Sequence, residues 1–140
     1  MTAMIQDKSG PVLGYRAMSV LLAILFLVQP ILIGQYMAGE SETFKDIHGG
    51  MGDALVLIAL IQTILAFLAR RTFGIGLAMH CAAMTVLTLL QVILGRSDYE
   101  QVKYHVPLGV LLFGMACAAV MLGFFDLRSQ RRLQANQDRN

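Results

Sequence analysis

Four apolar stretches dominate the sequence, and each of them is long enough to cross a lipid bilayer. A membrane-spanning helix needs about 20 consecutive apolar residues. Because a backbone in lipid must satisfy its own hydrogen bonds, stretches of this kind form helices. Charged residues make up only 14% of the 140-residue chain, which is far from the balance of an average soluble domain. We predict the helices at about residues 17–38, 48–69, 73–95 and 104–125.

These stretches predict an all-α fold, an integral membrane four-helix up-and-down bundle built from two helical hairpins. Residues 1–140 then form a single membrane domain, with a polar cytoplasmic tail at 126–140. Short loops between successive helices favour antiparallel neighbours. The lipid bilayer is therefore the first expected partner. The sequence contains no phosphate loop and no nucleophile–base or paired-carboxylate motif of a soluble enzyme.

The basic residues indicate how the bundle is oriented. Only three of the 11 lysines and arginines lie in the loops after the first and third predicted helices. By the positive-inside rule, both termini and the second loop are cytoplasmic. We therefore expect a multi-pass membrane protein with both termini in the cytoplasm; the resemblance described below implies a bacterial inner membrane. The small positive net charge reflects this topology, and no nucleic acid is expected as a partner.

The two predicted hairpins carry the same pattern of residues. The first helix of each ends in Q-x-x-x-G, as "QYMAG" (35–39) and "QVILG" (91–95). After a polar loop, the second helix of each opens with H-x-x-x-G, as "HGGMG" (48–52) and "HVPLG" (105–109). This pattern indicates an internal repeat, since a repeated spacing is the signature of a repeated structural unit.

The repeat predicts where the two histidines lie. The second and fourth helices of an up-and-down bundle are diagonal partners that run in the same direction, so His48 and His105 share one depth. Packed helix axes about 8–10 Å apart give a diagonal of roughly 12–14 Å, which suits two imidazoles with a flat macrocycle between them. Gly52 and Gly109 lie one turn away on the same faces and leave room for such a ring.

The pattern therefore predicts a cofactor site with His48 and His105 as its metal ligands. Histidine pairs on facing helices of a bundle commonly hold haem iron. Gln35 and Gln91, near the outer ends of the first and third helices, are predicted to donate to a ring carboxylate or to orient a ligating imidazole. The alternative is that a histidine at the mouth of a helix is simply hydrated at the membrane interface.

The motifs "GQYMAG…DIHGGMG" and "LLQVILG…YHVPLG" resemble one half of haem A synthase. That family has two four-helix halves, each with a pair of histidines on its second and fourth helices. The motifs are also similar to those of small bacterial four-helix membrane proteins with the same histidine placement. The resemblance covers about residues 30–115 and implies that His48 and His105 are axial ligands of haem b. The first loop lacks the cysteine of haem A synthase, so the resemblance implies haem binding more than haem oxidation.

Two further residues remain open to interpretation. His80, inside the third helix, is a second-rank metal ligand that could pair with Cys117 at a similar depth, or it could be satisfied by Thr85 or a backbone carbonyl. Asp53 could cap the site, take part in proton movement, or pair with Lys103 or Arg96. A carboxylate near a membrane is costly unless it is hydrated, paired or protonated.

The expected function is single-electron transfer by a bis-histidine haem b near the outer face of the membrane. Ligation of both axial positions favours electron transfer over oxygen chemistry. The protein would then be a component of a membrane oxidoreductase that works with a quinone or a redox partner protein. The alternatives are a haem carrier or sensor without redox turnover, and an accessory or scaffold subunit of a larger complex. A homo-oligomer is compatible with each of these.

Overall fold

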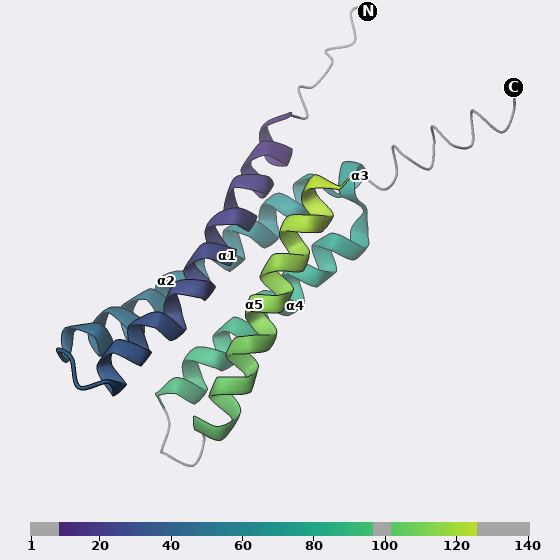
Figure 1. Cartoon of the computed structure of the whole chain (residues 1–140). Coiled ribbons are helices and arrows are strands. Elements are labelled where there is room, and N and C mark those ends of the chain that lie inside the picture. The colour runs from purple at the N-terminus through teal and green to yellow at the C-terminus, as the bar shows by residue number, and fades with distance from the viewer. Residues whose placement is uncertain (1–8, 97–101, 126–140) are drawn as a thin grey trace, which may run out of the picture.

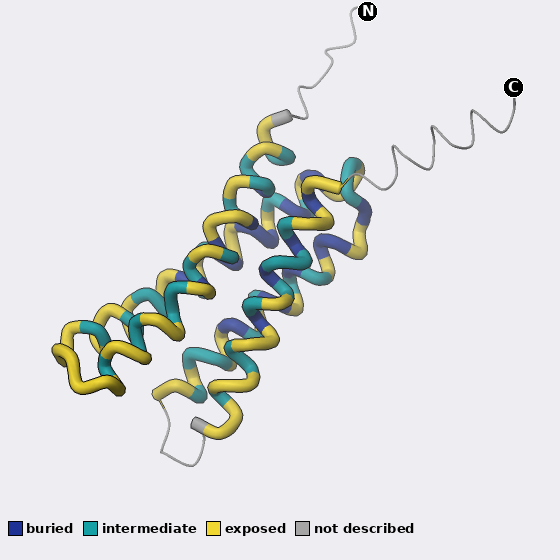
Figure 2. Tube along the Cα trace, viewed as in Figure 1, coloured by how far each residue is buried: buried dark blue, intermediate teal, exposed yellow. Residues whose placement is uncertain are grey.

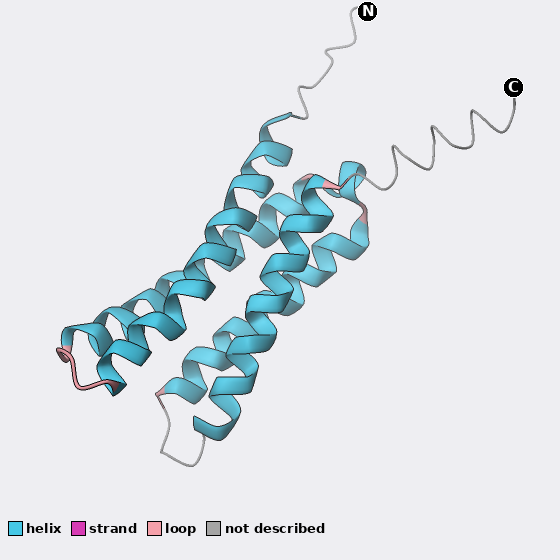
Figure 3. Ribbon diagram, in the orientation of Figure 1, coloured by secondary structure: helices cyan, strands magenta, loops and turns pink. Residues whose placement is uncertain are grey.

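The computed structural model describes residues 9–96 and 102–125, and four long helices account for most of them (Figure 1). The long helices are α1 (Ser9–Met37), α2 (Thr43–Leu68), α4 (Ile75–Gly95) and α5 (Val102–Phe124), and a single turn, α3 (Arg70–Phe73), connects α2 to α4. Each long helix is apolar enough to cross a membrane, and the described residues contain no strand (Figure 3). The all-α prediction is confirmed, and the chain is a multi-pass membrane protein. The predicted tail, residues 126–140, lies outside the described residues.

The long helices form an up-and-down bundle of two hairpins (Figure 1). Both α1 and α4 pack against α2 and α5. The helices α2 and α5 therefore lie on a diagonal of the bundle and run in the same direction. The α1–α2 loop lies at one end of the bundle, which we call the loop-bearing end, and the beginning of α1 and the end of α5 lie at the other.

Two helices begin earlier than hydropathy predicts. The first begins at Ser9 rather than near residue 17, and the second begins at Thr43 rather than at residue 48. Proline is tolerated in a first helical turn, so Pro11 does not prevent the earlier start of α1. Asp46 lies in the first turn of α2, where an acidic residue interacts favourably with the helix dipole. The consequence is that His48 lies in the second turn of α2 and not at its beginning.

The apolar core fills only part of the bundle (Figure 2). Among the described residues of 27–54 and 89–111, no residue is buried. Both stretches lie toward the loop-bearing end, which therefore lacks a packed core. The two core clusters consist of Leu22, Phe26, Leu55, Ala59, Met84, Leu112 and Ala116, and of Tyr15, Ala66, Leu77, Ala78 and Cys81.

Three carbonyl groups on one face of α5 accept hydrogen bonds from side chains of other helices. The acceptors are four residues apart, so they lie one above another along the helix. A hydrogen bond of this kind contributes about 1 kcal/mol to stability. These bonds fix α5 against α1 and α4. They join His80 Nε2 to Met115 O (3.0 Å), Tyr15 Oη to Ala119 O (2.8 Å) and Arg16 Nε to Gly123 O (2.9 Å).

The close packing of Gly123 against Tyr15 gives a prediction about stability. A Cβ atom at position 123 would lie 2.5 Å from Tyr15 Cε1, and Tyr15 is completely buried. Because overpacking a filled interior costs about 1–3 kcal/mol, we expect Gly123→Ala to lower the thermal unfolding midpoint in detergent. Gly114→Ala on the same helix is the matched control, because a Cβ there has no atom within 4 Å. An equal loss in both variants would contradict the packing argument.

Candidate functional site

A cavity of about 300 Å³ lies in the part of the bundle that lacks a core. This volume is at the lower end of the range of ligand pockets, which is about 300–1,000 Å³. All four long helices line the cavity, mostly with apolar residues. Its wall includes exposed residues on all four helices, among them Pro30, Gly49, Gly95 and Val106, so the cavity is open rather than enclosed. Its polar side chains are Gln29, His48, Thr88, Gln91, Arg96 and His105.

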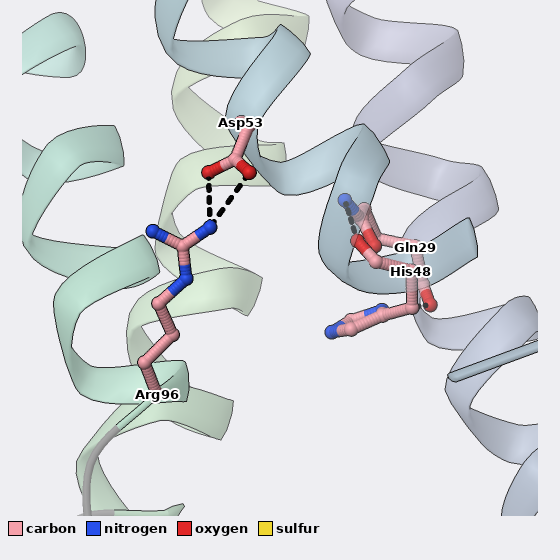
Figure 4. Close-up of polar contacts among 4 residues, drawn as sticks. All are labelled: Gln29, His48, Asp53 and Arg96. Carbon is pink, nitrogen blue, oxygen red and sulfur yellow. Dashed lines mark hydrogen bonds and ion pairs between the residues drawn. The ribbon is translucent and has the colours of Figure 1, made fainter. Parts of the chain in front are cut away.

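The two histidines predicted as metal ligands both line this cavity. The ring centroids of His48 on α2 and His105 on α5 are 6.2 Å apart, and the ring planes are inclined by 68°. The imidazole of His48 projects from α2 toward the α4–α5 hairpin (Figure 4). The structure thus places these two histidines at one level on diagonal helices.

Each imidazole is oriented by a backbone carbonyl of the neighbouring helix in its own hairpin. His48 Nδ1 lies 3.1 Å from Gln29 O, and His105 Nδ1 lies 3.0 Å from Gln91 O. Because a carbonyl oxygen only accepts hydrogen bonds, Nδ1 must carry the hydrogen in both rings. In the neutral ring, Nε2 is then the nitrogen that carries the lone pair. This is the usual state of a metal-binding histidine, whose other ring nitrogen donates to a carbonyl or carboxylate. In His105 the Nε2 lone pair faces Gln91 Nε2 at 3.4 Å, whereas no hydrogen bond is found at Nε2 of His48 among the described residues.

Gln29, rather than the predicted Gln35, is the counterpart of Gln91 in the first hairpin. Gln35 is exposed and does not line the cavity. The longer polar start of α2 moves His48 away from the loop, so its antiparallel neighbour lies deeper in α1. The contacting glutamine and histidine are 19 residues apart in the first hairpin and 14 in the second. Gln35 therefore does not contact His48 in this structure, and its role in cofactor binding stays a prediction.

The side-chain oxygens of Gln29 and Gln91 are buried and have no hydrogen-bond partner among the described residues. Gln29 Nε2 donates to His48 O at 3.3 Å, and Gln91 Nε2 lies 3.4 Å from His105 Nε2. A buried acceptor without a partner costs about 1–3 kcal/mol. Two such acceptors at corresponding places in the two hairpins indicate a cavity suited to a bound group or to ordered water.

Glycines keep the cavity open around the histidines. The predicted Gly52 and Gly109 both line it. A Cβ at Gly109 would lie 3.0 Å from Gln91 Nε2, whereas one at Gly52 would have 3.6 Å to its nearest neighbour. The sequence interpretation missed Gly95 as a site residue, although it ends the second Q-x-x-x-G motif. A Cβ there would lie 2.7 Å from His105 Cε1, so only glycine leaves this imidazole in place.

Arg96 is the only charged residue among those described that line the cavity. Its Nη2 lies 2.6 Å from both carboxylate oxygens of Asp53 (Figure 4). The ion pair joins α2 to the end of α4 at the edge of the cavity, and more than half of each side chain is exposed. Of the roles that the sequence left open for Asp53, the structure shows the pairing with Arg96.

His80 lies outside the cavity. Its Nε2 contacts Met115 O, so this nitrogen carries a hydrogen and does not offer a lone pair to a metal. Cys117 is a free, partly buried thiol. Within the described ranges, no three residues of the types His, Cys, Asp and Glu form a group that could hold a metal ion.

No family model, curated protein or solved structure matches the chain. The resemblance to one half of haem A synthase stays a prediction from short motifs. The functional argument therefore depends on the geometry of the cavity.

Proposed function

We propose that the protein binds one haem b between His48 and His105 and transfers single electrons near the loop-bearing end of the bundle. The observation that carries this proposal is the 6.2 Å separation of the two ring centroids. Two imidazoles on opposite sides of one metal ion have centroids about 6 Å apart, because a metal–nitrogen bond is about 2 Å long and the nitrogen lies about 1 Å from the ring centre. The spacing suits two axial ligands of one iron.

The surroundings of the histidines also support a flat, largely apolar ligand. Most of the wall is apolar, and glycines at 49, 52, 95 and 109 line it without side chains. The protein offers two ligand nitrogens, and a porphyrin supplies the four that complete an octahedral iron. A bare metal ion would instead require further protein ligands in the cavity, and among the described residues none forms such a group with the histidines.

The side chains have distinct tasks in this proposal. His48 and His105 would hold the iron, and the carbonyls of Gln29 and Gln91 keep both rings in the tautomer with the hydrogen on Nδ1 and the lone pair on Nε2. The mostly apolar wall would contact the apolar face of the ring. When bound, the haem supplies a one-electron redox couple. With both axial positions ligated, electron transfer is favoured over reaction with oxygen.

The distribution of basic residues supports a location for the site. With the termini in the cytoplasm of a bacterium, the loop-bearing end faces the outer side of the inner membrane. A quinone within the bilayer and a redox protein at the outer surface are the partners to which such a site would have access. The chain would then act as a component of a membrane oxidoreductase.

The absorption spectrum of the purified protein tests the proposal. We expect reduced-minus-oxidised bands of a six-coordinate b-type haem at one haem per chain. A protein that is colourless after purification from haem-replete cells, and that shows no such bands after titration with haem, would contradict haem binding. Reduction by a short-chain quinol then separates an electron carrier from a haem carrier or sensor. A haem-bound protein that no quinol reduces would argue against the quinone as partner.

A further inference from the structure

Arg96 places a positive charge at the edge of a mostly apolar cavity. Arg96 is the only charged residue among the described ones that line this cavity. It directly follows Gly95, whose backbone packs against the imidazole of His105. The guanidinium is therefore carried by the same part of the chain that keeps one proposed iron ligand in place.

The contact with Asp53 leaves part of the guanidinium for a second partner. Both carboxylate oxygens contact one nitrogen, Nη2 (Figure 4). An arginine side chain has five N–H donors on three nitrogens, and the contact with Asp53 uses neither Nε nor Nη1. Asp53 thus fixes the orientation of Arg96 without occupying all its donors. A planar guanidinium held in this way suits a carboxylate, which it binds through charge-assisted hydrogen bonds.

We infer that Arg96 binds a carboxylate substituent of the ring held between His48 and His105, and that Asp53 is a positioning residue for Arg96. This inference rests on the proposed function, since haem b carries two carboxylate side chains. Arg96 would then make the site selective. The site would bind a porphyrin with free carboxylates more tightly than a neutral porphyrin with the same ring and iron.

Titration of the haem-free protein with haem and with haem dimethyl ester tests the inference. The ester keeps the iron and the ring but has no free carboxylate. We expect the wild type to bind haem about tenfold more tightly than the ester, and Arg96→Gln to bind the two ligands equally. Arg71→Gln is the matched control, because it removes a positive charge from α3, outside the cavity, and should keep the wild-type preference. Differences in ligand partitioning into detergent cancel when the ratios are compared.

The outcomes separate the inference from the proposed function. If Arg96→Gln prefers haem over the ester as strongly as the wild type does, Arg96 does not bind the carboxylate, while tight binding of both ligands still supports haem as the cofactor. If the wild type binds neither ligand, both proposals are wrong. Should Arg96→Gln fail to fold, Arg96→Lys keeps the charge but not the planar guanidinium, and we expect its preference to fall to about threefold. An unchanged preference in that variant would overturn the inference.

The role of Asp53 has a test of its own. Asp53→Asn removes the charge that holds Nη2 but leaves Arg96 in the chain. We expect the preference for haem over its ester to fall to between that of the wild type and that of Arg96→Gln, because the guanidinium is then less well oriented. A preference equal to that of the wild type would show that Asp53 does not position Arg96.

Discussion

Purified His48→Ala and His105→Ala variants are each expected to lose the six-coordinate haem spectrum of the wild type. Removal of either imidazole takes away one of the two proposed ligands, and among the described residues no other histidine, cysteine or methionine lines the cavity. The remaining haem, if retained, should show the spectrum of a five-coordinate iron. The measurement is the oxidised and reduced absorption spectrum, with the haem content per chain determined on the same samples.

The third histidine of the described residues provides the matched control. His80 donates to Met115 O and lies outside the cavity, so His80→Ala should keep the wild-type spectrum and lose only about 1 kcal/mol of stability. A wild-type spectrum in His48→Ala or His105→Ala would exclude the proposed ligation. Loss of the spectrum in His80→Ala alone would place the haem elsewhere.

Gly95→Ala should weaken haem binding although residue 95 carries no ligand atom. The new Cβ would lie 2.7 Å from Cε1 and 3.0 Å from Nδ1 of His105. Since Nδ1 is the atom that donates to Gln91 O, the ring cannot avoid the methyl group and keep this hydrogen bond. A cost of about 1–3 kcal/mol is typical of overpacking, which corresponds to about a 5- to 150-fold loss of haem affinity.

Gly34→Ala is the matched control for this variant. Gly34 lies on α1, does not line the cavity, and would place a Cβ where no atom lies within 4 Å. Its haem affinity in a titration should equal that of the wild type. If Gly95→Ala also binds haem as the wild type does, His105 can move without loss of ligation, and the orientation of its ring is not required for binding.

Hydropathy was sufficient to predict the four membrane helices and their order. The free energy of placing about 20 apolar residues in lipid is large and depends little on neighbouring elements. The up-and-down arrangement followed from the short loops, and it placed His48 and His105 on diagonal helices. These features could be predicted because the helices depend only on the apolar residue types, and their arrangement depends only on the lengths of the loops.

The partners of the histidines could not be predicted in the same way. Hydropathy does not mark the polar first turn of α2, and the start of α2 determines which residue of α1 faces His48. This is why Gln29 occupies the place expected for Gln35. The contact of Gly95 with the ring of His105 depends on packing between α4 and α5, for which the sequence carries no separate signal. The pairing of Asp53 with Arg96, one of two basic partners considered, likewise depends on how α2 packs against α4.

The way in which the two imidazoles are oriented affects how substitutions would act on the site. Both rings donate to main-chain oxygens, at Gln29 and Gln91, and every residue type has such an oxygen. Replacement of either glutamine would change the amide in the cavity but leave the acceptor of Nδ1–H in place. A point mutation of Gln29 or Gln91 should therefore leave the tautomer of both histidines unchanged. Sequences related to this one could therefore vary at these two positions and still keep the lone pair of both imidazoles on Nε2.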